Sequence, residues 1–128
     1  MILDSSVLVA IVLREPGSET FIERLEAETT IGIGTPTLAE AGVVIAARLE
    51  IDAQPVLDRF LRAFDVLQIP FEEPHWRAAL DAYRRYGKRR HPAALNFGDC
   101  LSYAIAKVSG QPLLFAGDDF SRTDIAPA

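Results

Sequence analysis

The chain begins Met1-Ile2-Leu3-Asp4-Ser5-Ser6-Val7-Leu8-Val9-Ala10, and this segment is the most informative about the fold. In it a short apolar run is followed by one acid, two serines and a second apolar run. Residues 1–4 predict a buried strand. Residues 7–13 predict an apolar helix, for which Ser5 and Ser6 are good N-cap residues. Asp4 would then stand at the carboxyl end of the first strand.

Strand and helix patterns alternate along the rest of the chain. Short apolar or β-branched runs predict strands at residues 29–34, 66–70 and 112–116. Amphipathic or capped segments predict helices at residues 18–28, 35–50, 53–64, 73–86 and 96–110. Asp52 and Asn96 are the expected caps of two of these helices, and Gly87 is the expected end of another. Strands separated by one or two helices predict an α/β fold, a three-layer α/β/α sandwich with a mostly parallel central sheet, in one domain over residues 1–128. Such sheets bind ligands at the carboxyl ends of their strands, where the strand order reverses.

The composition is that of an ordinary globular domain, with 49% hydrophobic and 24% charged residues. The longest apolar runs, residues 7–13 and 42–47, are far shorter than the roughly 20 residues that a membrane span needs. Asp4 also interrupts any signal-peptide core, so we expect no membrane partner. The single Cys100 excludes an internal disulfide and fits a reducing cytoplasm.

The net charge of −5 argues against a nucleic-acid partner until the distribution of charge is considered. Five basic residues form what we call the basic strip: Arg84, Arg85, Lys88, Arg89 and Arg90. An acidic site beside one basic strip is the pattern expected for metal-assisted phosphodiester chemistry, and such cations bind a phosphate backbone by counterion release. A solubilising surface loop explains the strip equally well.

Four acids stand where a surface role is hard to explain. Asp4 and Asp119 follow predicted strands, whereas Glu40 and Asp99 lie near the starts of apolar helices. A carboxylate in an apolar setting is costly to ionise unless a cation or hydrogen bonds compensate it. Because all four positions share one rim of the predicted sheet, we expect them to converge on a divalent metal ion.

Each acid also has a plain structural explanation. Asp4 is a possible helix cap, and Glu40 a possible partner of a buried arginine or an acid that reaches water from the helix edge. Asp99 near a helix N-terminus is favoured by the helix dipole. Asp118 and Asp119 are possible turn residues. The conjunction of all four acids is what favours a metal site.

The kinds of ligand present indicate the metal and the reaction. Carboxylate oxygens suit Mg²⁺ or Mn²⁺, whereas one cysteine and two histidines without ligand spacing cannot build a zinc site. No phosphate-binding loop, dinucleotide glycine motif or nucleophile elbow is present. Carboxylate-bound metals activate water and stabilise displacement at phosphorus, so phosphodiester hydrolysis fits best.

Four motifs in order along the chain resemble PIN-domain toxins of the VapC type. They are the opening Asp4-Ser5-Ser6, the segment Thr37-Leu38-Ala39-Glu40, the segment Asn96-Phe97-Gly98-Asp99-Cys100, and a closing segment at residues 112–120 followed by Thr123-Asp124. The resemblance covers residues 1 to about 125 and implies a PIN-like nuclease domain.

The resemblance implies a role for each matching residue. Asp4, Glu40 and Asp99 match the metal ligands, and Asp119 matches the fourth catalytic acid. Residues that would orient the site are Ser6, Asn96 and Asp118. The family further implies cleavage of RNA, inhibition by a cognate VapB-type antitoxin, and a homodimer.

Aromatic and apolar residues outside the acidic site give further expectations. Tyr83 and Tyr86 are candidates for stacking on unpaired bases, although the helical spacing favours a core position for Tyr83. We assign Trp76 to packing. The apolar faces around Val44, Ile45 and Leu49, and on the helix at residues 53–64, are ordinary core or a surface for a partner.

Two other functions remain open from the sequence. One is a non-catalytic module of the same fold that binds RNA or acts with its antitoxin as a co-repressor. The other is a receiver or phosphatase domain, which is less well supported. Such a phosphatase needs an aspartate where Ser6 stands, and a receiver needs a lysine after the last strand, where Ala116 and Gly117 stand.

Overall fold

Four parallel strands form the central sheet in a computed structural model that describes residues 1–128. In chain order they are β1 (Ile2–Leu3), β2 (Ile31–Gly34), β3 (Val66–Ile69) and β4 (Leu113–Leu114). Their spatial order is β3-β2-β1-β4. The direction of winding therefore reverses between β1 and β4, where ligands of open α/β sheets bind.

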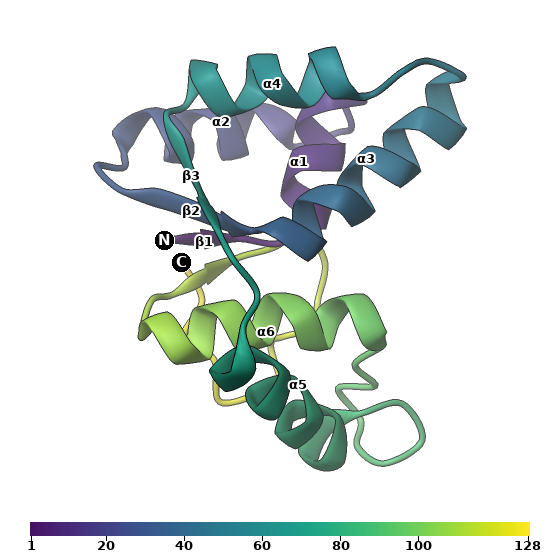
Figure 1. Cartoon of the computed structure of the whole chain (residues 1–128), viewed down its shortest axis with the longest axis vertical. Helices are drawn as coiled ribbons and strands as arrows, with labels where there is room; N and C mark the ends of the chain where they lie inside the picture. The colour runs from purple at the N-terminus through teal and green to yellow at the C-terminus, as the bar shows by residue number, and fades with distance from the viewer.

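Six helices cover the two faces of the sheet. Four lie on one face: α1 (Ser5–Val12), α2 (Ser18–Ala27), α3 (Thr35–Leu49) and α4 (Gln54–Ala63). Two lie on the other: α5 (Glu73–Tyr86) and α6 (Phe97–Ser109). Figure 1 shows these layers above and below the strands. The predicted three-layer fold with a parallel sheet is confirmed, and no helix is both long and apolar enough to cross a bilayer.

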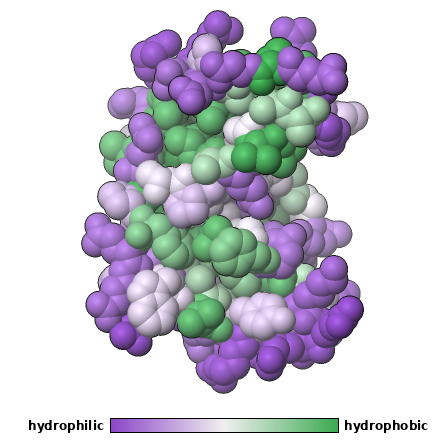
Figure 2. Space-filling model, turned by 45° about the vertical axis from the view of Figure 1, so that its right-hand side comes forward, coloured by the Kyte–Doolittle hydropathy of each residue, from purple (hydrophilic) through white to green (hydrophobic).

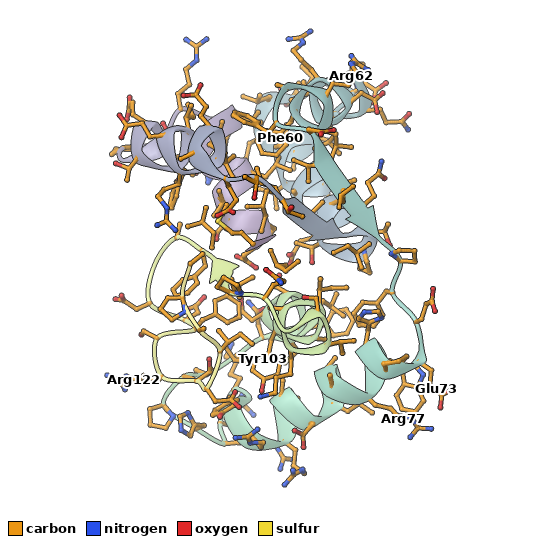
Figure 3. All side chains as sticks on the ribbon, turned by 90° about the vertical axis from the view of Figure 1, so that its left-hand side faces the viewer. Phe60, Arg62, Glu73, Arg77, Tyr103 and Arg122 are labelled. Atoms are coloured by element: carbon orange, nitrogen blue, oxygen red, sulfur yellow. The ribbon has the colours of Figure 1, made fainter.

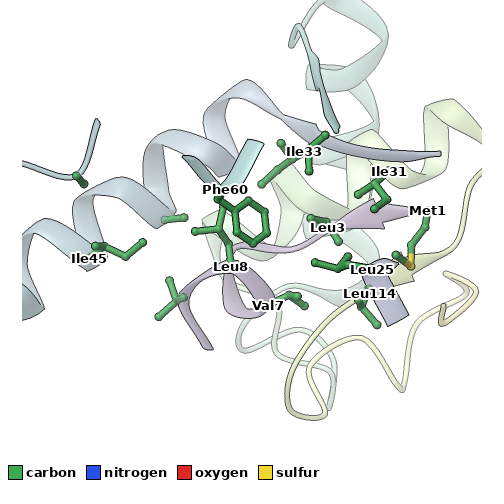
Figure 4. Packing of buried hydrophobic residues seen from close by; sticks show 14 residues of the cluster. Met1, Leu3, Val7, Leu8, Leu25, Ile31, Ile33, Ile45, Phe60 and Leu114 are labelled. Atoms are coloured by element: carbon green, nitrogen blue, oxygen red, sulfur yellow. The ribbon is translucent and has the colours of Figure 1, made fainter. Parts of the chain in front are cut away.

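The sheet separates two hydrophobic cores, because successive side chains of a strand point to opposite faces. Leu3 packs with the helices α1 to α4, in the cluster drawn in Figure 4. Ile2 packs in the second core, which includes Tyr103 and Leu113. Each fully buried leucine or isoleucine stabilises the fold by about 1.5–3 kcal/mol.

Strand β2 has the sequence Ile-Gly-Ile-Gly, so isoleucines face one side of the sheet and glycines the other. This alternation allows α6 to pack closely against the strand. Ile31 and Ile33 belong to the first core. Gly34 leaves room for helix α6 on the other face, since a Cβ there would lie 2.7 Å from Cγ1 of Ile105. No real Cβ tolerates such a contact, so this glycine permits the close packing of β2 and α6.

Local signals place most element boundaries correctly, although the N-cap of α4 is Ala53 and Asp52 accepts the Gln54 N–H from one position earlier. Asn96 caps α6 and Gly87 ends α5, as predicted. The prediction that Ser5 or Ser6 caps the first helix is wrong, because Asp4 is the N-cap and accepts a hydrogen bond from the Ser6 N–H at 3.1 Å. The aspartate is the first polar side chain after the strand, so the helix begins immediately behind it.

The surface is polar at both ends of the long axis, with hydrophobic and weakly polar side chains mixed across the face between them (Figure 2). Charged side chains such as Arg62, Glu73 and Arg77 project outward, whereas Tyr103 lies inside, between α6 and the C-terminal segment (Figure 3).

The C-terminal segment covers the outer edge of β4, because Leu113 donates its N–H to the carbonyl of Ala126 at 2.9 Å.

Candidate active site at the carboxyl ends of the strands

Asp4 lies at the end of β1 and is only 5% exposed. Its Oδ2 accepts hydrogen bonds from the Ser6 hydroxyl at 2.6 Å and the Ser6 N–H at 3.1 Å. Its Oδ1 accepts one from the Ser102 hydroxyl at 2.5 Å. Donors on both oxygens hold the carboxylate in one orientation and compensate much of its lost hydration. Asp4 is thus both a helix cap and a fixed acid at the switch point of the sheet.

Ser6 connects this acid to the neighbouring strand, since its Oγ also accepts the Ala116 N–H at 3.0 Å. The end of β4 is therefore tied to the start of α1. These contacts hold Ser6 against Asp4, while its role in orienting the site stays a prediction.

Two buried hydroxyls that the sequence interpretation missed complete the surroundings of Asp4. Ser102 and Thr37 are each 1% exposed, and their hydroxyls lie 3.4 Å apart. Each stands three residues from an acid on its own helix, Ser102 after Asp99 and Thr37 before Glu40. Residues three apart share a helix face, so this spacing was the available signal.

Asp99 lies in the first turn of α6 and is 9% exposed. Its Oδ2 accepts the Asn96 N–H at 3.0 Å, while Oδ1 of Asn96 accepts the Asp99 N–H at 2.9 Å. Burial, with smaller contributions from the negative charges of Asp119, Asp4 and Glu40, raises the pKa of Asp99 to about 6 against the opposing hydrogen bond from Asn96. The four predicted acids thus lie close enough to influence one titration.

Glu40 lies on α3 with its carboxyl group directly against Gly98 of α6. A Cβ on Gly98 would be 2.8 Å from Cδ and 2.9 Å from Oε1 of Glu40. Glu40 has no arginine partner, and none of the five ion pairs of the molecule contains Asp4, Glu40, Asp99 or Asp119. The absence of a side chain at Gly98 is what lets Glu40 approach the helix turn that carries Asp99.

Asp118 and Asp119 follow β4 and Gly117, whose φ of 83° makes the turn. Both are exposed. The Asp118 carbonyl accepts hydrogen bonds from the N–H and hydroxyl of Ser121 at 3.1 and 2.6 Å, so this residue belongs to a turn. No hydrogen bond joins the Asp118 side chain to the other acids, whereas the charge of Asp119 acts on Asp99.

The donor set fits a hard divalent cation. It consists of carboxylates that form no ion pair with lysine or arginine. Two of them are buried, and the pKa of Asp99 is raised mainly by burial and additionally by the other acids. No three acidic, histidine or cysteine side chains converge tightly enough to form a ligand set by themselves. Mg²⁺ usually retains several waters and takes only one or two carboxylates directly, so such a set is not required.

The basic strip divides into two parts. On α5, Arg84 pairs with Asp81 at 2.5 Å and Arg85 pairs with Asp124 at 3.5 Å, so these two arginines have structural partners. The remaining cations, Lys88, Arg89 and Arg90, are exposed in the following loop and form no ion pair.

Three aromatic predictions need correction. Tyr83 is 43% exposed and lies under the Arg90 guanidinium, 5.3 Å from the ring centre, so it is not a core residue. Tyr86 is 8% exposed and packs edge-on against His91, so its ring is not free to stack on a base. Trp76 is 44% exposed, with Arg77 over its ring at 4.4 Å, rather than packed inside. Helical spacing shows which residues of α5 share a face. It does not show how much of that face is covered by α6.

Comparison with known proteins agrees with this geometry. A family model described as the PIN domain matches residues 1–126. Ribonuclease VapC30 of Mycobacterium tuberculosis is 44% identical over 126 residues, which cover 98% of this chain and 96% of the relative. The crystal structure of M. tuberculosis VapC20 has a TM-score of 0.78 at 16% identity, covering 99% of this chain and 97% of that chain. VapBC2 from Rickettsia felis, bound to a promoter DNA fragment, gives 0.72 at 16% identity, with 98% and 94% covered.

The parallel sheet with acids gathered at its carboxyl ends is that of a PIN-domain protein, and the chain belongs to this family. Within the family it is a VapC-type ribonuclease, the toxin of a toxin–antitoxin system.

Proposed function

We propose that Asp4, Glu40 and Asp99 hold a Mg²⁺ or Mn²⁺ ion with which this endoribonuclease hydrolyses phosphodiester bonds of RNA. The observation that carries the proposal is the pair of buried acids, Asp4 and Asp99, that have no cationic partner. PIN-domain ribonucleases generally depend on divalent metals. A bound ion of this kind supplies water activation and charge neutralisation at phosphorus.

The residues of the chain have separable roles in this proposal. Asp4 is oriented by Ser6 and Ser102, and Asp99 by Asn96. Asp119 stands on the open side of the site, where an exposed carboxylate can accept the proton of the attacking water. The unpaired cations Lys88, Arg89 and Arg90 bind the phosphate backbone of the substrate. Arg84 and Arg85 contribute less, because acids already neutralise them.

The proposed protein partners follow from the family. Structural neighbours include the complex of a toxin with its antitoxin, which supports inhibition by a VapB-type antitoxin. We also propose a homodimer, for which α3 offers the exposed side chains Val43 and Leu49, 70% and 45% exposed. Ile45, named with Leu49 as a possible partner surface, is fully buried and belongs to the core. The protein meets its RNA in the cytoplasm, where a buried thiol such as Cys100 stays reduced.

The test replaces the acids singly by their amides. Asp4→Asn and Asp99→Asn should lose metal-dependent RNA cleavage and growth arrest, whereas Asp58→Asn, at an exposed and unpaired acid of α4, should keep both. EDTA should abolish cleavage by the unaltered protein. Full cleavage by both variants would reject the proposal. Equal RNA binding with and without Mg²⁺, without any product, would favour the non-catalytic RNA-binding or co-repressor function instead.

A further inference from the structure

An apolar pocket lies beside the acidic site, between α5 and the first turn of α6. It has a volume of about 270 Å³, and its lining residues are Ala79, Leu80, Tyr83, Phe97 and Cys100. No charged side chain lines it. An engineered apolar cavity of roughly 150 Å³ holds benzene, so this pocket has room for a larger flat ring.

The pocket is adjacent to the chemistry along α6. Phe97 and Cys100 flank Asp99 within the first helical turn. Phe97 is 79% exposed, and Leu80, across the pocket on α5, is 63% exposed. Other large apolar side chains are exposed singly elsewhere, but here two of the most exposed, Phe97 and Leu80, line one apolar pocket, which indicates that something covers them.

Charge identifies what covers them. The loop that follows α5 carries the unpaired Lys88, Arg89 and Arg90, and the Arg90 guanidinium lies over Tyr83, which lines the pocket. An occupant therefore combines a flat apolar surface with negative charge. A second copy of the chain fits less well, because a two-fold contact centred here would bring two basic loops together.

We propose that this pocket binds one unstacked base of the RNA, with Phe97 and Tyr83 as the stacking surfaces and the loop cations on the adjoining phosphates. The inference rests on the proposed nuclease function and adds a place for the base beside the bond that is cut. Apart from the Tyr83 hydroxyl, the lining has no strong hydrogen-bonding side chain to read a base edge. The pocket therefore recognises any planar base rather than one sequence.

The test measures binding without cleavage, in EDTA, by fluorescence anisotropy. The probe is a labelled single-stranded RNA of mixed sequence, and the comparison is the same backbone with abasic central nucleotides. Phe97→Leu keeps the apolar side chain and removes the π face. It should weaken binding of the intact RNA by about 5- to 150-fold and leave the abasic RNA unaffected. Tyr83→Leu should act in the same direction, and Val108→Ala, at an exposed apolar residue near the opposite end of α6, should have no effect.

Several results would overturn the inference. One is unchanged binding of the intact RNA by both Phe97→Leu and Tyr83→Leu, and another is equal loss on the intact and abasic RNA. A change in sedimentation of Phe97→Leu would assign this face to a second copy of the chain. Because the measurement needs neither metal nor cleavage, its outcome is independent of the Asp4→Asn and Asp99→Asn test.

Discussion

Replacing Gly98 by alanine should separate stability from activity. An alanine Cβ would collide with Oε2 of Glu40 and lie 2.8 Å from its Cδ, so the carboxyl group must retreat until these contacts reach an ordinary 3.4 Å or more. The end of a flexible side chain can move in this way without disturbing the fold. The movement changes the position of the Glu40 carboxylate relative to Asp99, so the cost should appear in metal binding rather than in folding.

The structure gives the size and sign of both effects. Displacing a group that supports a metal site typically costs about 10- to 100-fold in metal affinity or activity, or roughly 1.4–2.7 kcal/mol. Alanine in a helix is favoured over glycine by up to about 1 kcal/mol, so the melting temperature should stay level or rise by about 2–5 °C. A variant that is as stable as the original protein and binds metal more weakly is the expected result.

Calorimetric titration of the metal-free protein with Mn²⁺, thermal unfolding and RNA cleavage measure these quantities. The matched control is Gly42→Ala in α3, where a Cβ meets only Cδ1 of Leu57 at 2.9 Å. Shortening the acid in Gly98→Ala with Glu40→Asp should recover part of the affinity. If Gly98→Ala binds Mn²⁺ as tightly as the unaltered protein, then Glu40 does not contribute to metal binding from the position beside Gly98 that the structure shows.

Three further predictions concern the neighbouring polar groups. Since the pKa of Asp99 in the folded protein is about 6, above its ordinary 3.8, stability of the metal-free protein should fall as the pH rises from about 4 to 6. Asp99→Asn should remove that decline and raise the melting temperature at pH 7. Ser102→Ala removes the donor to Oδ1 of Asp4 and should lower cleavage about 10- to 100-fold with the fold intact by circular dichroism. The hydrogen bonds from Lys107 and Tyr103 lower the pKa of Asp124 to about 2, although burial alone would raise it, so its stabilising contribution should vanish as the pH falls from about 4 to 2. Asp124→Asn should lower the melting temperature at pH 7 without loss of RNA cleavage, and a matching loss of cleavage would contradict a purely structural role.

Local chemistry explains which parts of the fold were predictable. Asn96 predicts the start of α6 and Gly87 predicts the end of α5, because capping interactions act within a few residues. Both predictions are confirmed. The N-cap of α1 was predicted wrongly because three successive polar residues could each accept a backbone N–H. Asp4 is the N-cap because β1 ends at Leu3, directly before it.

The site was predictable only where residue type alone suggests a function. Carboxylates in apolar segments stand out, and the four predicted acids do lie near one another. Ser102 contacts Asp4 across 98 positions of sequence, and its only local signal is a spacing of three residues from Asp99, which many hydroxyl residues in helices would also show. The exposure of Phe97 and Tyr83 likewise depends on how far α5 and α6 cover one another, which their own sequences do not contain.

The two-residue strand β1 belongs to both hydrophobic cores, with Ile2 on one side and Leu3 on the other. If the helices on one face of the sheet unfolded alone, the side chains of β1 on that face would be exposed to water. The chain should therefore unfold cooperatively as one unit. The Asp4 N–H, bonded to the Leu114 carbonyl at 3.0 Å, should then exchange with solvent only through global opening. The candidate active site would then lie at the end of a strand that is expected to open only when the whole domain unfolds.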